Sequence, residues 1–372
     1  MNLFSPNMRT DEILDSLREV FNSGWIGLGP RVERFEKEVG AKIGSKNVIA
    51  TSCCTGAIQI ALKAIDIPQG SLVATTPVTF VSTNHSILHA GHFPVFLDVN
   101  PLTGNIDVES LKDAISQHDI KALVVVHLAG YPCDMDEIND ICKESNIAVI
   151  EDCAHAFGAS YKGNPVGSGQ NICCWSFQAV KNLPLGDGGA VTTQDQDLDI
   201  LMRKLRWMGI DKDTISRNTV GYKWEYNVPE AGYRFYMNDI AAAIGSVQIK
   251  YIDDDNAKRS RIASIYKENI RSGTSPDYKD DRVSSYHFFP FFFSNRKEVY
   301  DELVRNDIHP GIHYKLNTRY PMYADSIKMR NLQNAHLYEL TEITLPIHTF
   351  LTDDDLQKII DVVNRVGKRP KI

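Results

Sequence analysis

The feature that most constrains this fold is a regular alternation of short apolar segments with helix-length segments over the first two-thirds of the chain. The apolar segments have strand length and are continuous; they lie at 47–50, 72–75, 95–97, 122–127 and 148–150. Continuous apolar strands are buried on both faces, because a strand with one face in water alternates polar with apolar residues. The pattern therefore predicts a mostly parallel sheet with helices packed on both sides.

Two more strand candidates, at 172–177 and 190–193, follow without long helices between them. They complete a predicted three-layer α/β fold with a mostly parallel seven-stranded sheet, which we assign to residues 1–250. After about residue 251 the chain becomes more charged, and then gives an apolar strand at 287–292 and helical patterns near 299–304 and 354–366. This change predicts a smaller C-terminal α+β domain over residues 251–372.

Charge and cysteine content exclude several classes of function. The 372 residues include 40 Lys and Arg against 47 Asp and Glu, a net charge of -7, which argues against a nucleic-acid or anionic-membrane partner. No apolar run approaches the roughly 18 residues of a membrane-spanning helix, and the first residues lack the form of a signal peptide. The seven cysteines form no CxxC pair, which argues against zinc and against a disulfide framework. We therefore expect a cytoplasmic protein with reduced thiols and no bound metal.

Polar residues follow two of the predicted strands, and each group has an ordinary structural explanation beside a chemical one. Thr55 and Gly56 open a helix after the first strand. This arrangement suits a phosphate, but it is also common at any strand–helix junction. The segment 151–155 (Glu-Asp-Cys-Ala-His) follows the strand at 148–150, where open α/β sheets place their ligands. A helix cap and a solvated turn would explain that segment equally well.

A third group follows the strand at 172–177. Ser176 lies at the end of this strand, and Lys181 comes five residues later, directly before a glycine-rich segment at 185–189. A single lysine is most often a solvated surface charge, and such glycines are also typical of a plain tight turn. The group becomes informative only in combination with the other two.

Together the three groups meet the needs of pyridoxal phosphate. That cofactor requires a lysine for its Schiff base, an acid near the pyridine nitrogen, donors for its phosphate and a flat group stacked on its ring. In this sequence the candidates are, in that order, Lys181, Asp152, Thr55 with Gly56 and Ser176, and Phe80. As a carboxylate, Asp152 would keep the pyridine nitrogen protonated through a charge-assisted hydrogen bond.

Longer motifs resemble one known family along nearly the whole chain. They are WIGLGPRVERF at 25–35, PVTFVST at 77–83, EDCAHAFGASYKG at 151–163, SFQAVKNLPLGDGGAVTT at 176–193, GYRFYMNDIAAAIG at 232–245 and LPIH at 345–348. With these motifs the chain resembles the DegT/DnrJ/EryC1/StrS sugar aminotransferases, which are fold-type I pyridoxal-phosphate enzymes. The resemblance implies a sheet and domain arrangement like that of aspartate aminotransferase.

The resemblance also implies a role for each candidate residue. Lys181 would bind the cofactor and then move a proton between the substrate Cα and the cofactor C4′, while Asp152 pairs with the pyridine nitrogen. His155 would lie beside the ring near its phenolic oxygen, and Phe80 would stack on the ring. The remaining candidates, which would hold the phosphate, are Thr55, Gly56 and Ser176.

In the family, the partner subunit of a homodimer completes each active site, usually through an Asn in the motif that matches 232–238. Here the motif reads GYRFYMN, with Arg234 and Tyr236 where Lys or Asn is common. We expect Arg234 to reach the partner's phosphate, because a guanidinium suits phosphate, although the departure leaves Tyr236 as the alternative. His313 and Tyr314 match a segment that approaches the substrate; a buried histidine would explain His313 equally well.

The activity implied by the resemblance is transfer of an amino group from L-glutamate to a keto-sugar, with pyridoxamine phosphate as the intermediate form of the cofactor. The expected acceptor is a nucleotide-linked 4-keto-6-deoxy or 3-keto sugar, used for a surface polysaccharide or a related glycan. Alternatives are a sugar 3-dehydratase, whose relatives carry histidine in place of Lys181, a transaminase for a non-nucleotide sugar aldehyde, and a non-catalytic regulator. An NAD dehydrogenase would need a glycine fingerprint, and the near match at 167–169 opens no helix. The acceptor depends on segments such as 212–230 and 315–323, in which no pattern identifies it.

Overall fold

The computed structural model describes residues 1–211 and 226–371, and its central element is an eight-stranded sheet. Its strands are β1 (Asn47–Thr51), β2 (Leu72–Thr75), β3 (Phe93–Phe96), β4 (Ile120–Val126), β5 (Ala148–Asp152), β8 (Ile172–Ser176), β9 (Gly189–Thr193) and β12 (Ile327–Lys328). Their order across the sheet is β1-β9-β8-β5-β4-β2-β3-β12. β9 is antiparallel to both of its neighbours, and the other strand pairs are parallel.

The sheet confirms the mostly parallel α/β fold, with one strand more than the sequence predicts. The seven predicted strands are all present, and β12 adds an eighth at the edge beside β3. β12 has two residues and belongs to the C-terminal third of the chain. A pairing this short leaves no apolar run in the sequence, so pattern analysis could not find it.

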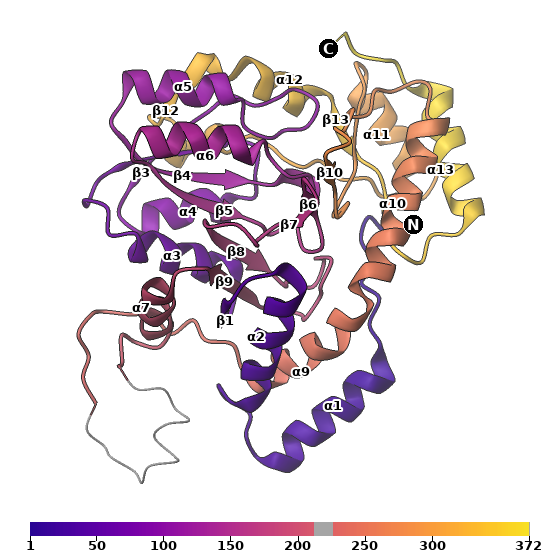
Figure 1. The fold of residues 1–372 in the computed structure, drawn as a ribbon. Helices are drawn as coiled ribbons and strands as arrows, with labels where there is room; N and C mark the ends of the chain where they lie inside the picture. Colours follow the sequence, from indigo (N-terminus) through magenta and orange to yellow (C-terminus); the bar gives the residue numbers. More distant parts are fainter. Residues whose placement is uncertain (212–225, 372) are drawn as a thin grey trace.

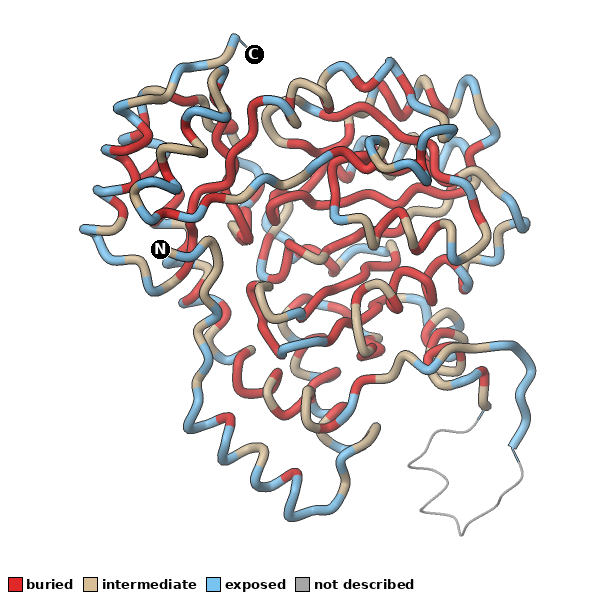
Figure 2. The backbone as a smooth tube through the Cα atoms, turned by 180° about the vertical axis from the view of Figure 1, so that it is seen from behind, coloured by how far each residue is buried: buried red, intermediate tan, exposed pale blue. Residues whose placement is uncertain are grey.

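Helices cover both faces of the sheet (Figure 1). One face packs against α3 (Cys54–Ala64), α4 (Val81–His89) and α7 (Gln196–Arg206). The opposite face packs against α2 (Pro30–Ile43) and α9 (Asp239–Gln248) near β1, and against α5 (Val108–Gln117) and α6 (Met135–Glu144) near β3 and β4. Burial is concentrated in the strands and in the sides of these helices that face them (Figure 2).

Neighbouring residues on a strand alternate between these two faces, as the pleat requires. Cys173 packs with the residues of α2 and α9, and Cys174 packs with those of α3 and α7. All seven cysteines are free thiols, and six of them are buried. The adjacent cysteines therefore contribute to two separate parts of the core.

The C-terminal third packs around an aromatic core that it shares with residues of the earlier part of the chain, such as Phe96 and Leu128. Its elements are α10 (Ile252–Asn269), β10 (Arg282–Val283), β11 (Pro290–Phe292), α11 (Arg296–Arg305), α12 (Gln333–Thr341), β13 (Glu342–Thr344) and α13 (Asp353–Val366). β11 pairs antiparallel with β13, and β10 joins a small sheet with β6 (Ser160–Tyr161) and β7 (Asn164–Pro165). α1 (Thr10–Ser23) packs on α9 at the other end of the molecule.

The first residues of the chain also lie against this C-terminal unit. The Met1 amine donates to the Asp307 carbonyl at 2.6 Å, and the His309 amide donates to the Met1 carbonyl at 3.0 Å. The ring of Phe4 stacks on His287 with the ring centres 5.3 Å apart. Division of the chain at residue 250 stays a prediction, since residues 1–4 pack with the later segment.

Two predicted elements have different limits in the structure. The strand expected at 287–292 begins only at Pro290, because the His287 amide donates to Ala129 in the loop after β4 instead of to β13. The helix expected from Gly56 begins at Cys54, with Cys53 as its N-cap. Both shifts follow from contacts that are distant in sequence or from a cap of an unusual residue type.

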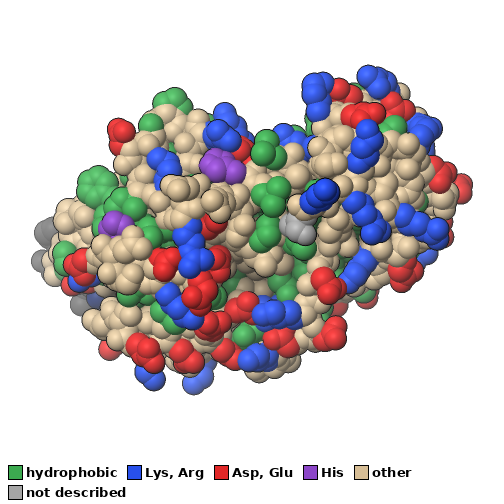
Figure 3. Space-filling view, turned by 90° about the horizontal axis from the view of Figure 1, so that it is seen from above, with side chains coloured by type: hydrophobic (Ala, Val, Ile, Leu, Met, Phe, Trp, Pro, Cys, Tyr) green, Lys and Arg blue, Asp and Glu red, His purple; other side chains and the backbone are tan. Residues whose placement is uncertain are grey.

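The surface carries charges of both signs. On the face shown in Figure 3, Lys and Arg side chains lie among Asp and Glu, and neither sign dominates a region. None of the helices in residues 1–211 and 226–371 combines the length and the apolar character needed to cross a membrane.

Candidate active site

A pocket of about 410 Å³ opens at the carboxyl ends of β4, β5 and β8, the edge at which open α/β sheets place ligands. Its wall includes the last residue of each of these strands, Val126, Asp152 and Ser176. The structure brings eight of the predicted site residues to this wall: Thr55, Phe80, Asp152, His155, Ser176, Lys181, His313 and Tyr314. Residues far apart in the sequence thus converge on one cavity.

Asp152 is the last residue of β5 and is 3 % exposed. Its Oδ2 accepts a hydrogen bond from Thr83 Oγ1 at 2.8 Å, and its Oδ1 accepts one from the Ala154 amide at 3.0 Å. Burial raises the pKa of Asp152, while these hydrogen bonds and the positive charge of Lys181 act against that rise. Two donors therefore orient the carboxyl group and favour its ionised form at the base of the pocket.

Lys181 lies in the turn that follows β8 and is partly buried. Burial lowers the pKa of its amine to about 8, although the charge of Asp152 acts in the opposite direction. Among the described residues there is no direct ion pair between Lys181 and Asp152, so space remains in the pocket between the amine and the carboxyl group. An amine with a pKa this close to neutral can act as a nucleophile and can exchange protons.

His155 is buried in a stack of rings on the other side of the pocket. The centre of its ring lies 4.5 Å from that of His287 and 6.3 Å from that of Tyr314, and its Nε2 is 3.2 Å from the Tyr314 hydroxyl. Burial and the nearby charge of Lys181 hold the pKa of His155 and of His287 well below the usual range for histidine. The Nδ1 of His155 is buried without a hydrogen-bond partner, so the site holds a neutral ring with one unpaired polar atom.

The first turn of α3, where the sequence predicts a phosphate site, lies beside the pocket. Thr55 lines the pocket, whereas Gly56 lies in the helix with its amide directed to Cys53 Sγ at 3.4 Å. The side chain of Phe235 packs against the Gly56 Cα so closely that a Cβ there would lie 2.9 Å from the ring. The position accordingly requires glycine for packing, and its expected contribution to phosphate binding stays a prediction.

Arg234 lies outside the pocket of its own chain. It is exposed and donates to the Tyr236 hydroxyl at 3.3 Å. Phe80 lines the pocket and is 58 % exposed, with its ring 6.4 Å from that of Tyr314. The expected roles of Arg234 on a partner and of Phe80 on a cofactor ring both stay predictions.

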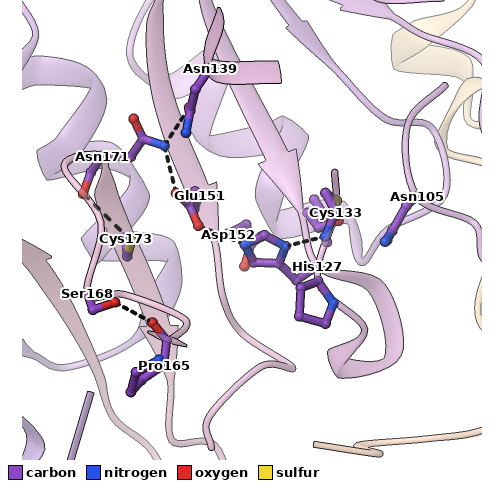
Figure 4. A network of polar contacts seen from close by, with 12 residues as sticks. Asn105, His127, Cys133, Asn139, Glu151, Asp152, Pro165, Ser168, Asn171 and Cys173 are labelled. Atoms are coloured by element: carbon purple, nitrogen blue, oxygen red, sulfur yellow. Dashed lines mark hydrogen bonds and ion pairs between the residues drawn. The ribbon is translucent and has the colours of Figure 1, made fainter. Parts of the chain in front are cut away.

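Glu151, the neighbour of Asp152, points away from the pocket into a buried polar network (Figure 4). Its carboxylate accepts from His127 Nε2 at 2.8 Å and from the Asn171 side chain at 2.7 Å. The Cys133 amide donates to His127 Nδ1, which therefore carries no hydrogen. Cys153 also lies close to His127 and Glu151, and these three side chains are of types that can ligate a metal ion. Both ring nitrogens of His127 are engaged in hydrogen bonds, however, and neither is free to ligate a metal ion.

Sequence reasoning missed several residues of the pocket wall. Thr83 lies within the quoted motif at 77–83, one turn into α4 and within reach of Asp152. His287 is the first residue of the apolar segment 287–292, and Phe4 comes from the N-terminal segment. The position of Thr83 one helical turn after Phe80 is a signal that could have been used, but no local pattern identifies Phe4 or His287.

The segment before Tyr314 is fixed to β13 by hydrogen bonds to Glu342 and Thr344, which do not line the pocket. The His313 amide donates to Glu342 Oε2 at 2.8 Å, and His313 Nδ1 lies 2.8 Å from Thr344 Oγ1. Thr344 Oγ1 in turn donates to Glu342 Oε1 at 2.6 Å. Of the segments named as candidates for substrate choice, 315–323 lies directly after this region, whereas 212–225 lies outside the described residues.

Comparisons with known proteins identify the family to which this chain belongs. The model of the DegT/DnrJ/EryC1/StrS aminotransferase family matches residues 7–364. The chain is 34% identical over 369 residues to the spore coat polysaccharide biosynthesis protein SpsC of Bacillus subtilis, with 96% of this chain and 95% of the relative covered. It is 30% identical over 368 residues to a UDP-4-amino-4,6-dideoxy-N-acetyl-beta-L-altrosamine transaminase of Campylobacter jejuni, with 96% and 95% covered.

A solved structure shows the same fold. The sugar aminotransferase CalS13 from Micromonospora echinospora superimposes with a TM-score of 0.90 at 30% sequence identity. The superposition covers 98% of this chain and 99% of that one.

Proposed function

The chain belongs to the DegT/DnrJ/EryC1/StrS aminotransferase family, whose members are sugar aminotransferases that use pyridoxal phosphate, and from this premise we propose that it transfers the amino group of L-glutamate to a nucleotide-linked keto-sugar. The expected acceptor is a 4-keto-6-deoxy or 3-keto sugar. The product would serve a surface polysaccharide or a related glycan. The names of the relatives from Bacillus and Campylobacter, a polysaccharide biosynthesis protein and a transaminase, support this proposal.

The observation that carries the proposal is the convergence of Lys181 and Asp152 on one pocket without a direct ion pair. An amine and a buried carboxyl group held apart suit a flat ring that binds covalently at one side and through a ring nitrogen at the other. The unpaired Nδ1 of His155 suits a polar substituent of that ring. The residues present therefore fit pyridoxal phosphate, which when bound supplies an electron sink for a carbanion at the substrate Cα.

Each side chain then has a task that follows from its surroundings. Lys181 would hold the cofactor, and its free amine would carry a proton to and from the substrate, since burial keeps the pKa of this amine at about 8. Asp152 would hold the ring nitrogen, because Thr83 and the Ala154 amide orient its carboxylate. Thr55 and Ser176 lie at the end of the pocket near the start of α3, where helix amides favour a phosphate.

We also propose that the enzyme is a homodimer with shared active sites. The pocket is open to the surface at Phe80, and Arg234 is exposed on the surface, where another subunit can approach it. Leu14, Phe21 and Ile26, in or just after α1, are each more than half exposed, which suits burial in an interface. The free thiols are consistent with a reducing compartment, so we place the enzyme in the cytoplasm.

The visible spectrum of the protein with pyridoxal phosphate tests the first half of the reaction. We expect an absorbance band from the lysine-bound cofactor, which L-glutamate should bleach as the cofactor takes up the amino group. Lys181→Arg is the matched control, because it keeps the cation but cannot bind the cofactor covalently. A band that persists with glutamate would contradict this donor, and a band in the Lys181→Arg protein would contradict the role of the lysine.

The acceptor and the shared site need two further measurements. A panel of nucleotide-linked keto-sugars, added to the aminated enzyme, should restore the original spectrum if one of them is the acceptor. Mixing inactive Lys181→Ala and Arg234→Ala proteins should restore part of the activity, because a hybrid dimer has one site with both residues intact. Full activity of a monomer in sedimentation would contradict the shared site.

A further inference from the structure

A chain of three side chains links the pocket to the buried interior of the C-terminal unit. His313 lines the pocket together with Lys181, and its ring stacks on Phe288 with the centres 4.6 Å apart. Thr344 and Glu342 lie behind it on β13, and both are fully buried. The backbone of this segment is also fixed, since Gly311 and Thr344 exchange two amide–carbonyl hydrogen bonds of 2.9 Å.

The hydrogen bonds in this chain determine where the hydrogen of His313 lies. An ionised Glu342 can only accept, and it accepts from the His313 amide and from the Thr344 hydroxyl. The hydroxyl hydrogen is then used, so Thr344 Oγ1 must accept from His313 Nδ1 across their 2.8 Å contact. In this state Nδ1 carries the hydrogen, and Nε2 presents a lone pair to the pocket.

A proton added to Glu342 reverses the direction of this chain. The protonated Oε1 donates to Thr344, Thr344 donates to His313 Nδ1, and the hydrogen of the neutral imidazole moves to Nε2. The same contacts serve both states, because every oxygen and nitrogen in the chain can exchange its role as donor or acceptor. One proton at a buried carboxyl group thus changes the nitrogen available to the pocket from an acceptor to a donor.

We propose that Glu342, Thr344 and His313 form a proton relay that exchanges a proton with an oxygen atom of the keto-sugar. This inference rests on the proposed function for the identity of the substrate. His313 would be the residue that touches the sugar, and Thr344 and Glu342 are positioning residues that act through it. The family resemblance drew attention to His313 and Tyr314 only; the two residues on β13 emerge from the structure.

The relay transfers one proton without forming an imidazolium ion. Glu342 gives its proton to Thr344, Thr344 gives its own to His313 Nδ1, and Nε2 gives its hydrogen to the sugar oxygen. The network ends with a carboxylate and with a neutral ring protonated at Nδ1. When an amine replaces the ketone oxygen, that oxygen leaves as water with two protons, one from the relay and one from the amine nitrogen. The second proton lost by the amine nitrogen returns along the same path to Glu342.

The surroundings of His313 and Glu342 explain why a relay is needed. Burial and the charge of Lys181 hold the pKa of His313 at about 3, so an imidazolium would be costly. Burial raises the pKa of Glu342 to about 8, against the lowering effects of the Thr344 hydroxyl, the His313 amide and Arg296 on α11. The other titratable groups facing the carboxyl are the phenols of Tyr338 on α12 and of Tyr314, whose own pKa values are raised. Glu342 can therefore gain or lose a proton near neutral pH while His313 stays neutral.

Three substitutions separate the relay from a merely structural role. Glu342→Gln keeps the acceptor for the His313 amide and places an amide donor against Thr344, which imitates the protonated state and fixes the hydrogen on Nε2. Thr344→Val keeps the shape but breaks the path. Thr344→Ser keeps the hydroxyl and is the matched control for the valine variant.

The direct test is nuclear magnetic resonance of the full chain, loaded with pyridoxal phosphate and containing nitrogen-15 histidine. The His313 signals are assigned by their loss in His313→Gln. We expect the hydrogen to move from Nε2 to Nδ1 as the pH rises through about 8 in the wild-type and Thr344→Ser proteins. It should stay on Nε2 in Glu342→Gln, and its position should not depend on pH in Thr344→Val. A wild-type ring that does not change between about pH 6 and 10, or a valine variant that titrates like the wild type, overturns the proposal.

Kinetics supply the second readout. Thr344→Val should slow the keto-sugar half-reaction by roughly 100-fold, the scale of one general acid–base contact, and leave the glutamate half-reaction within about twofold. Equal losses in both halves would indicate a structural defect and overturn the relay. If no keto-sugar reacts at all, the proposed function fails, whereas the resonance experiment still decides whether the relay exists.

Discussion

The raised pKa of Glu342 makes a quantitative prediction about stability. The carboxyl group has a pKa of about 8 in the folded chain, against an ordinary value of 4.5. A difference of about 3.5 between these two pKa values corresponds to about 5 kcal/mol, at about 1.4 kcal/mol for each pH unit. Because folding raises this pKa, its contribution is fully present below pH 4.5 and is lost as the pH rises to 8.

Glu342→Gln removes that loss, since glutamine does not ionise. Relative to the variant, the wild type should lose about 4 kcal/mol of unfolding free energy between about pH 5 and 9. For 372 residues, an unfolding entropy of about 2.1 cal/mol/K per residue converts this figure to a change of about 5 °C in the difference between the two melting temperatures. All other titrating groups are shared by the two proteins and cancel in the difference.

The assay is thermal unfolding of both proteins at matched scan rates from about pH 5 to 9. Glu339→Gln is the control, because it removes a partly exposed carboxylate that pairs with Arg319 nearby. A melting difference between wild type and Glu342→Gln that stays constant with pH would refute the reasoning. So would a variant that is strongly destabilised at every pH, because the carboxylate would then be the form that the fold requires.

Three further predictions concern the pocket and the core. Lys181→Ala should abolish turnover while circular dichroism and the melting temperature stay near those of the wild type; retained transamination would remove the lysine from the mechanism. Thr83→Val should weaken binding of pyridoxal phosphate by about tenfold or more, since it removes a hydrogen bond to the Asp152 carboxylate. Absorbance titration measures this affinity, with Thr83→Ser as the control that keeps the hydroxyl; an unchanged affinity in Thr83→Val would show that the bond has no role. Glu36→Ala should cost about 3 to 5 kcal/mol in urea unfolding, because it leaves the buried guanidinium of Arg206 without its partner, and a loss below about 1 kcal/mol would contradict this account.

The sequence predicts the sheet well because each strand has its own local signal. The continuous apolar segments identify the buried strands, and polar residues at their ends locate the pocket, as for Asp152 and Ser176. β12 could not be found in this way, since Ile327 and Lys328 pair through the backbone and carry no pattern of their own. The strand expected from His287 was too long, because a hydrogen bond to the loop after β4 replaces its pairing.

Functional residues could be predicted from the sequence where a family motif follows the end of a predicted strand. Lys181 and His155 are of this kind, and the structure places both in the pocket. Glu342 and Thr344 are not, because their importance comes from contact with a histidine about thirty residues earlier along the chain. No spacing rule connects such positions, so only the tertiary structure shows that Glu342 and Thr344 on β13 form hydrogen bonds with His313.

The pairing of β1 with β9 also bears on how the chain is made. Thr51 and Gly189, the paired residues of these strands that are closest in sequence, are 138 residues apart, so β1 is synthesised long before the strand that it pairs with. On the ribosome the β2–α4–β3 unit can close locally, while the buried segment of β1 has no partner on either edge. Pairings of such long range form slowly, because the entropy of closing the loop is lost before any contact is gained. The nascent chain thus exposes this segment until Thr193 has emerged, and this is the interval in which a chaperone would protect it from aggregation.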